Sequence, residues 1–233
     1  MVEQLLEARG ITFRKRGNPI LKPTDVSLNK AKTTFLIGPN GAAKTTLLRI
    51  LFGLMKPSGG EIERHNEETG NASFVFQSPT LMRRDVFENI AYPLQIQKIA
   101  KTKIKASVEH QAEQLGLTDK LSLAANRLSG GEQQKMALAR ALITNPDTIY
   151  LDEPTSNLDG ASTALIEAQL KHQSQQGKTI IMASHDLAQT KRLAQRVLFL
   201  YHGSIIEDAA SDSFFATPKT EEAKAFLRGD ILA

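Results

Sequence analysis

Short apolar runs recur along the chain, and each one is followed by glycine or by a polar or charged residue. They lie at residues 33–37, 72–76, 148–151 and 179–183. Each run has the length of a buried strand, and segments with helical spacing separate them. The alternation predicts an α/β fold with a parallel, doubly wound sheet.

The first 32 residues show a different pattern, with shorter apolar stretches. Gly17, Asn18 and Pro19 interrupt them, and all three residue types favour turns. We therefore predict short strands here, which form an antiparallel sheet at one edge of the core.

The segment from about residue 80 to residue 127 has no strand pattern. Ile104, Val108, Gln111 and Leu115 instead recur at helical spacing, in a stretch rich in Lys and Glu. The pattern predicts a helical subdomain, inserted at approximately 80–145 into a single domain that spans residues 1–233.

Composition narrows the possible classes of protein. The 233 residues are 41% hydrophobic and 23% charged, which is ordinary for a folded domain, and the absence of cysteine excludes disulfides and thiolate metal sites. The first residues lack the basic start and apolar stretch that are typical of a signal peptide, and no apolar run approaches the roughly 20 residues of a membrane span. The net charge of +4 suits an anionic ligand, but Lys and Arg are scattered and Trp is absent. We expect a cytoplasmic protein that reaches a membrane only through a partner and does not bind nucleic acid as its main partner.

The stretch GPNGAAKTT, residues 38–46, lies between an apolar run and a helical pattern. The free N–H groups and the dipole at a helix N-terminus attract anions, so this is where a phosphate-binding loop would lie. Lys44 would contact the β- and γ-phosphates, and the Thr45 hydroxyl would bind Mg²⁺. Gly38 and Gly41 permit turns and close approach of the backbone to phosphates. An ordinary strand-to-helix turn is the alternative interpretation.

Ala43 departs from the pattern of such loops, which have glycine directly before the lysine. A methyl group fits there if residue 43 has a negative φ. It clashes if φ is positive or if a phosphate lies against the Cα atom. The sequence leaves both possibilities open.

Two carboxylates, Asp152 and Glu153, directly follow the apolar run at 148–151. Ligands of open parallel sheets collect beyond the carboxyl ends of the strands. Asp152 would hold hydrated magnesium there, and Glu153 would polarise an attacking water. The alternative, that these charges merely end a strand, is weakened by the phosphate loop upstream.

The stretch LSGGEQQ, residues 128–134, contains a second helix start. Ser129 and Glu132 have the spacing of a capping box for a helix that runs through Met136. A cap alone does not require Gly130 and Gly131, which expose the N–H groups of the helix start. One monomer has little use for two γ-phosphate sites, so we infer that this surface meets ATP bound to another copy of the chain.

In chain order, the motifs GPNGAAKTT, FVFQ, LSGGEQQ, IYLDEP, SNLD and ASHD resemble those of the ATP-binding subunit of an ABC transporter. The resemblance implies the ABC ATPase fold with a P-loop NTPase core, ATP and Mg²⁺ as cofactors, and ATP hydrolysis. It also implies that the whole phosphate loop contacts nucleotide. These contacts are Gly38, Pro39, Asn40, Gly41, Ala42, Ala43, Lys44, Thr45 and Thr46.

The resemblance assigns roles to three further residues. Gln77 would touch Mg²⁺ and the attacking water, and His185 would contact the γ-phosphate; with Lys44 and Glu153 they form the expected catalytic set. Asp159 would lie in a loop that crosses a two-fold interface, although Asp-Gly is also a plain turn. The segment Ser129 to Gly131 would complete the ATP site of the opposing subunit in an ATP-sandwich homodimer.

The residues ahead of the phosphate loop depart from the family, which usually stacks an aromatic side chain on adenine. Phe-Arg-Lys-Arg stands at residues 13–16. Arg14, Lys15 or Arg16 could cover the base by cation–π contact or planar stacking.

The resemblance also implies partners and a location. Separate transmembrane permease subunits, and through them a substrate-binding protein, would hold this chain at the cytoplasmic face of a membrane. Residues 78–97 are the expected docking surface, with Arg83, Arg84, Phe87 and Tyr92. The alternative is that the apolar ones are simply core.

The stretches FVFQSPTLMRRDVFENI, HDLAQTKRLAQRVLFLYHGSIIE and AKAFLRGDIL look most like the ATPases of bacterial tungstate importers. Phosphate, molybdate or a metal ion is the alternative cargo. A soluble ABC ATPase outside transport is the alternative of another class, but such proteins usually have a second cassette or a long coiled-coil insertion. A module without turnover would lack Glu153 or His185, and both are present.

Overall fold

The computed structural model describes residues 3–65 and 71–230. The chain forms two compact units. One combines residues up to 70 with those from 177 onward, and the other consists of residues 71–176. Within the described ranges, no helix has both the length and the apolar character needed to cross a membrane.

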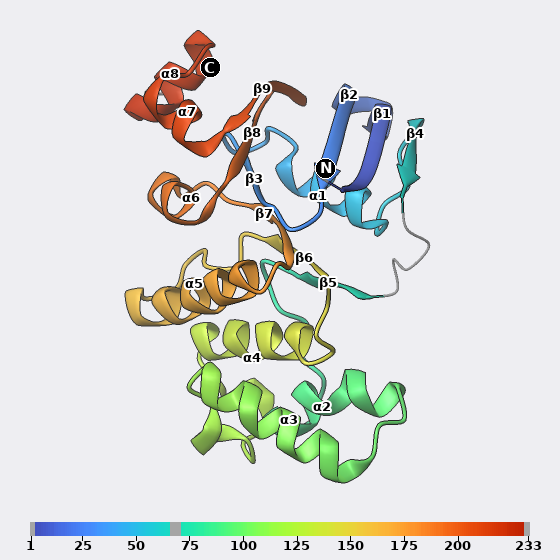
Figure 1. Cartoon of the computed structure of the whole chain (residues 1–233), viewed down its shortest axis with the longest axis vertical. Coiled ribbons are helices and arrows are strands. Elements are labelled where there is room, and N and C mark those ends of the chain that lie inside the picture. Colours follow the sequence, from blue (N-terminus) through green and yellow to red (C-terminus); the bar gives the residue numbers. More distant parts are fainter. Residues whose placement is uncertain (1–2, 66–70, 231–233) are drawn as a thin grey trace. The chain divides into compact units, whose positions relative to one another are not determined.

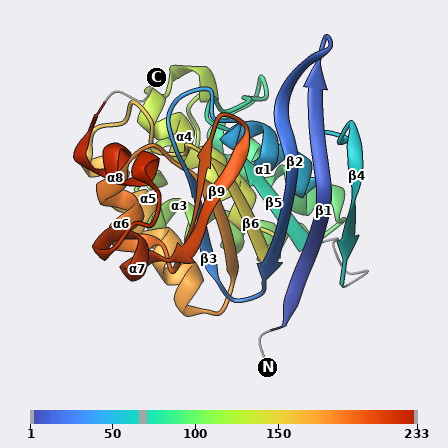
Figure 2. The same cartoon turned by 90° about the horizontal axis from the view of Figure 1, so that it is seen from above.

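An antiparallel sheet forms the N-terminal part of the first unit (Figure 2). It contains β1 (Gln4–Lys15), β2 (Asn18–Asn29) and β4 (Gly59–Arg64) in the order β2-β1-β4. The predicted antiparallel sheet is confirmed, but the prediction of short strands is wrong, because β1 and β2 have 12 residues each. Pro19 does not interrupt β2 because it lies near the start of an edge strand, where proline is tolerated.

Four more strands of the first unit follow the order β7-β3-β8-β9. β3 (Thr33–Ile37) is parallel to β7 (Thr179–Ala183) and to β8 (Arg196–Tyr201), and β9 (Ser204–Ala210) is antiparallel to β8. All residues of β3 and β7 are buried. Strands covered on both faces read as continuous apolar runs, so both were predicted with the observed bounds.

Helices α1 (Lys44–Phe52), α6 (Leu187–Leu193), α7 (Ser211–Ala216) and α8 (Glu221–Arg228) complete the first unit (Figure 1). α1 buries one apolar face, made of Leu47, Leu48, Ile50 and Leu51. α7 and α8 pack on β8 through aromatic contacts. The ring centre of Phe199 lies 5.8 Å from that of Phe214 and 5.2 Å from that of Phe226.

The second unit has a parallel strand pair, β5 (Ala72–Val75) and β6 (Thr148–Asp152). Its helices are α2 (Val86–Ile96), α3 (Lys101–Gln114), α4 (Gly130–Leu142) and α5 (Gly160–Gln175), with short 3₁₀ turns at Thr118–Lys120 and Ala125–Arg127. α2, α3 and α4 lie together (Figure 1).

Helix α3 confirms the helical pattern read from the sequence, because Ile104, Val108 and Leu115 are buried along or just beyond it. α2, α3 and α4 occupy the range in which the helical insertion was expected. The insertion itself, at approximately 80–145, stays a prediction, since the compact unit that contains these helices has wider bounds, 71–176.

Candidate active site

The loop between β3 and α1 is shaped by glycine and folds around a lysine. Gly38 has a φ of 144°, and a Cβ atom there would lie 2.0 Å from the backbone oxygen of Leu200, so only glycine fits. The buried Lys44 ammonium donates to the carbonyl oxygens of Gly38 at 2.8 Å and of Pro39 at 3.1 Å. Ala42 closes the loop by donating its N–H to the Pro39 oxygen at 3.2 Å. The ammonium is thus held by carbonyl oxygens of the loop itself.

Ala43 takes the second of the two conformations that the sequence left open. Its φ is 78° and its ψ is 18°, in the left-handed region. This region costs a non-glycine residue about 1–2 kcal/mol. The loop therefore keeps the conformation that glycine would favour, and the alanine is strained in it. Ala43 also provides no side-chain cap for α1, so its side chain satisfies none of the N–H groups at the helix start.

The other loop residues differ in exposure. Asn40 and Gly41 are exposed, whereas Thr45 and Thr46 are half-buried in the first turn of α1. Gly41 has a φ of 83°, and a Cβ atom there would meet nothing within 4 Å. Its role is therefore to turn the backbone rather than to allow close packing.

His185 lies beyond the end of β7, the strand next to β3. The register pairs Leu36 with Ala183, so both strands end at the same edge of the sheet. Ser184 fixes the turn by donating its N–H to the Leu36 oxygen at 3.1 Å and by accepting the N–H of Asp186 on Oγ at 3.1 Å. His185, between them, is exposed. The first unit thus places His185 at the edge where the phosphate loop begins.

In the second unit, Gln77 and Glu153 are in direct contact. The parallel register pairs Val75 with Leu151, so the residues two positions further along also lie side by side. Gln77 Nε2 donates to Glu153 Oε2 at 3.2 Å and to Ser156 Oγ at 3.4 Å. The predicted water-polarising carboxylate is therefore held by the amide whose role was assigned by resemblance.

The turn that carries Glu153 has a strained backbone conformation, which hydrogen bonds from Ser156 hold in place. Glu153 has a φ of 46°, which a side chain of this size rarely adopts. The Glu153 carbonyl accepts the N–H of Ser156 at 3.2 Å and its hydroxyl at 3.0 Å. Such strain occurs where the surrounding structure enforces it, often at functional sites.

Asp152, the last residue of β6, is fully buried. Thr45, Gln77 and Asp152 would supply hydroxyl, amide and carboxylate oxygens, which are the hard ligands that Mg²⁺ prefers. The chemistry of this set therefore fits magnesium.

Another cluster of metal-ligand side chains consists of Glu7 on β1, Glu63 on β4 and His65 just beyond β4, which approach one another. Arg9 lies between the carboxylates, 2.7 Å from Glu7 and 3.6 Å from Glu63. These acids already have a cation as their partner, so we assign no metal to them.

The start of α4 is a capping box, as predicted. Ser129 Oγ accepts the N–H of Glu132 at 3.4 Å, and Glu132 Oε2 accepts the N–H of Ser129 at 2.8 Å. The Lys120 ammonium lies 2.9 Å from Glu132 Oε1. The hydrogen bond from Lys120, and then that from the Ser129 backbone, lower the pKa of Glu132 to about 2.

The two glycines of this stretch have different surroundings. A Cβ atom on Gly130 would meet nothing within 4 Å, whereas one on Gly131 would lie 2.7 Å from Ser162 Oγ. Asp159 caps α5 by accepting the Ser162 N–H and hydroxyl, both at 2.8 Å. The Ser162 backbone bond is the main reason that the pKa of Asp159 is lowered. A side chain on Gly131 would have to displace the Ser162 hydroxyl, so the close packing favours glycine. This packing brings the α4 start next to Asp159, which here has a capping role. The interface role of Asp159 stays a prediction.

The residues proposed to cover a base lie at the turn between β1 and β2. The Arg14 guanidinium donates to the Gly17 carbonyl at 3.3 Å, and Arg16 has a φ of 50°. The prediction that Arg14, Lys15 or Arg16 covers the base stays a prediction.

Sequence reasoning missed Ser156, Ser162 and Lys120. Each supports a predicted residue through a contact that depends on how the loops fold. Ser156 follows Glu153 by three positions and Ser162 follows Asp159 by three, so turn and capping patterns were available signals. For Lys120 the sequence held no such signal.

Comparison with known proteins gives a consistent result. The family model described as ABC transporter matches residues 21–156. The tungstate uptake system ATP-binding protein TupC of Peptoclostridium acidaminophilum is 37% identical over 204 residues, which cover 85% of this chain and 94% of that protein. The phosphate import ATP-binding protein PstB 2 of Natronomonas pharaonis is 31% identical over 253 residues, which cover 100% of this chain and 89% of that protein. The arginine transport ATP-binding protein ArtM of Bacillus subtilis is 35% identical over 221 residues, which cover 89% of this chain and 92% of that protein.

A solved structure also matches the chain. It is the dimeric structure of a post-hydrolysis state of the ATP-binding cassette MJ0796 bound to ADP and Pi, with a TM-score of 0.81 and 26% identity. The match covers 89% of this chain and 99% of that one. It confirms the predicted fold class.

Proposed function

This chain belongs to the ABC transporter family, and we propose that it is the ATP-hydrolysing subunit that powers an importer for tungstate or a related oxyanion. The observation that carries hydrolysis is the contact of Gln77 with Glu153, 3.2 Å between Nε2 and Oε2. An amide that donates to the carboxylate fixes its direction, and in our proposal this carboxylate is the group that accepts a proton from water.

The reaction is attack of water on the γ-phosphorus, with cleavage of the bond to the β–γ bridging oxygen. In our proposal Glu153 accepts the proton of the attacking water, while Gln77 orients that water. His185 donates to an oxygen of the γ-phosphate and offsets its developing charge. Glu153 is the residue without which turnover should stop.

Lys44 would bind the β- and γ-phosphates by exchanging its present acceptors. Its ammonium now donates to the Gly38 and Pro39 carbonyls, and phosphate oxygens would replace these weaker, neutral partners. Mg²⁺, held through Thr45, Gln77 and Asp152, would neutralise charge on the phosphates.

A groove of about 430 Å³ in the second unit supports the permease as partner. Tyr92, Pro93 and Ile96 of α2 line it, and Ile96 is 63% exposed. An apolar groove beside a helix is the shape that takes an amphipathic helix. This favours a cytoplasmic helix of a permease as occupant over a role outside transport. The remaining apolar lining consists of Phe74, Val75, Phe76, Pro79, Met82, Ala137 and Ala141.

The cargo part of the proposal comes from the relatives. The tungstate and phosphate proteins both serve oxyanions, whereas the arginine protein, at 35% identity, serves an amino acid. The motif flanks quoted above favour tungstate. A binding protein and the channel would select the ion, so no residue of this chain is expected to touch it.

The test is transport by a reconstituted complex. Permease subunits that co-purify with this chain would be placed in vesicles with the chain, ATP and Mg²⁺ on the outside and the binding protein inside. In this orientation an importer moves its cargo out of the lumen. We therefore expect an ATP-dependent loss of tungsten from the vesicles, measured by mass spectrometry. Glu153→Gln should abolish it.

Competition identifies the cargo. Excess molybdate should reduce tungstate movement, whereas arginine should not. Movement of phosphate, with none of tungstate, would identify a different oxyanion as the cargo. Movement of arginine, with none of any oxyanion, would contradict the proposed cargo class. ATP hydrolysis that no permease stimulates would contradict the transport role itself.

A further inference from the structure

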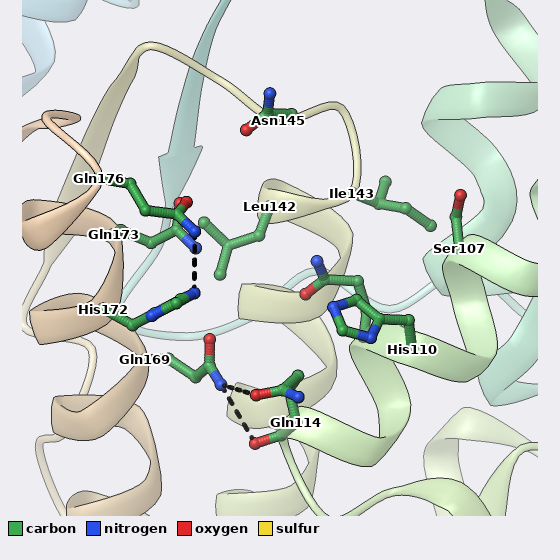
Figure 3. A pocket seen from close by; sticks show the side chains of 11 residues that line it. Ser107, His110, Gln114, Leu142, Ile143, Asn145, Gln169, His172, Gln173 and Gln176 are labelled. Carbon is green, nitrogen blue, oxygen red and sulfur yellow. Dashed lines mark hydrogen bonds between the residues drawn. The ribbon is translucent and has the colours of Figure 1, made fainter.

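A second hollow in the same unit shares no residue with the candidate active site. It has a volume of about 490 Å³ and lies between α3, the end of α4 and α5 (Figure 3). This is within the size range of small-molecule sites. Ser107, His110 and Gln114 face it from α3, and His172 and Gln176 face it from the α5 side (Figure 3).

Most of the lining residues are polar, but none of them carries a permanent charge. Among the lining residues that the structure describes, amides and imidazoles predominate, and Lys, Arg, Asp and Glu are absent. Leu142 and Ile143 form a small apolar wall between the polar sides (Figure 3). A charged ligand would lose its hydration here without gaining a counter-charge, which is unfavourable.

Some of the amides are already paired and therefore fix the walls. Gln169 Nε2 donates to Gln114 Oε1 at 3.0 Å, which links α5 to α3. Gln176 Nε2 lies 2.9 Å from His172 Nε2. These bonds hold both sides of the pocket in place without a ligand.

Two other amides have hydrogen-bonding groups left over. Gln173 is only 8% exposed, and its side chain makes no hydrogen bond to any residue in the described ranges. Gln111 Oε1 is a buried acceptor without a partner in the same part of the chain. Buried polar groups normally find partners, and the Gln173 amide, which lines the pocket, is the group that a bound molecule would satisfy.

The amides of the pocket define the chemistry of the ligand. The Gln173 amide offers both a donor and an acceptor. An oxyanion has only acceptors and carries charge, so neither the proposed cargo nor a triphosphate suits the pocket. The ligand should be neutral and should present donors and acceptors on one edge.

We propose that this pocket binds a nucleobase, free or as a nucleoside. Glutamine amides pair with the donor–acceptor edge of a base. The rings of His110 and His172 provide planar surfaces of the kind on which bases stack. The site would let a neutral nucleoside bind this subunit independently of ATP.

Calorimetric titration tests the proposal. The full chain is first saturated with a non-hydrolysable ATP analogue and Mg²⁺, so that the ATP site is filled. Adenosine, guanosine, cytidine and uridine are then titrated separately, with glucose as a neutral non-planar comparator and tungstate as an anion. We expect saturable binding of at least one nucleoside and none of the comparators.

Variants locate the site. Gln173→Leu removes an unpaired buried amide, so the fold should be kept, and the affinity should fall about ten-fold or more. His110→Ala, at an exposed position, should weaken binding too. Gln95→Leu, an exposed amide of α2 outside the pocket, is the matched control and should leave affinity unchanged.

The proposal is overturned if no nucleoside saturates at millimolar concentration, or if glucose or tungstate binds instead. It is also overturned if Gln173→Leu and His110→Ala bind as well as the unaltered chain, or if more ATP analogue displaces the nucleoside. None of these outcomes depends on the transport function.

Discussion

At the scale of single residues, Ala43 holds a left-handed backbone conformation, φ 78°, that glycine adopts without strain. Ala43→Gly should remove about 1–2 kcal/mol of strain and add about 0.5–1 kcal/mol of unfolded-state entropy. We therefore expect the free energy of unfolding to rise, by at most about 1.5 kcal/mol. ATP should bind equally well or more tightly. Urea unfolding and an ATP titration measure the two effects.

The neighbouring alanine is the control for this prediction. Ala42 is also buried but is not among the residues with positive φ. Ala42→Gly should therefore lower the free energy of unfolding by about 0.5–1 kcal/mol. If Ala43→Gly destabilises the protein as much as Ala42→Gly does, packing of the methyl group outweighs the strain. A marked loss of ATP affinity would show that the loop requires the alanine.

The sequence predicts which residues belong to the candidate site better than it predicts which of them contact one another. Glu153 was found from its place after a buried strand, and Gln77 only by family resemblance. Their 3.2 Å contact follows from the β5–β6 register, which the sequence does not encode as a local pattern. The sign of φ at Ala43 was unreadable for a similar reason, because it depends on how the whole loop closes.

At the scale of elements, the start of α4 is stabilised by charge. The pKa of Glu132 is lowered from 4.5 to about 2, so the folded state favours the carboxylate. This stabilisation is fully present above pH 4.5 and is lost as the pH falls toward 2. Glu132→Gln can keep the capping hydrogen bond but loses the charge. We expect it to lower the free energy of unfolding by about 0.5–1 kcal/mol at pH 7, a modest value because the ion pair is partly exposed to solvent.

Urea unfolding of the unaltered chain and of Glu132→Gln at pH 7 and pH 3 checks this prediction. The difference in their free energies of unfolding should be smaller at pH 3. Glu109→Gln is the control, since Glu109 lies 3.8 Å from Lys105 in a well-exposed pair. Its effect should stay within about 0.5 kcal/mol. A Glu132→Gln effect that is equal at both pH values would show that the charge does not stabilise α4.

The elements themselves were predictable where burial leaves a continuous pattern. β3 and β7 are buried along their whole length and could be read directly. β4, with the sequence GGEIER, has no fully buried residue, so no apolar run marked it. β9 is likewise mostly exposed or half-buried. Its pairing with β8 depends on tertiary contacts rather than on its own pattern.

At the scale of the whole molecule, the proposed ATP site is shared between two copies of the chain. Each phosphate loop would be completed by the α4 start of the other copy. Phosphate release per molecule should therefore rise with protein concentration. Glu153→Gln should bind ATP and accumulate as a dimer in light scattering, because the dimer forms but cannot turn over. A constant rate per molecule, with monomeric Glu153→Gln in ATP, would contradict the shared site.

Mixing two inactive variants tests the sharing directly. Lys44→Ala removes the phosphate contact but keeps the α4 start. Gly130→Asp keeps the phosphate loop and puts a negative charge at the α4 start, where the structure has room for a side chain. Each variant alone should be inactive, because both sites of its symmetric dimer carry the defect. In a mixed dimer both defects fall in one site and the other is intact, so the mixture should recover up to about a quarter of the normal rate. If the mixture stays inactive although mixed dimers form, then either each chain builds its own site or hydrolysis at one site requires the other site to be intact.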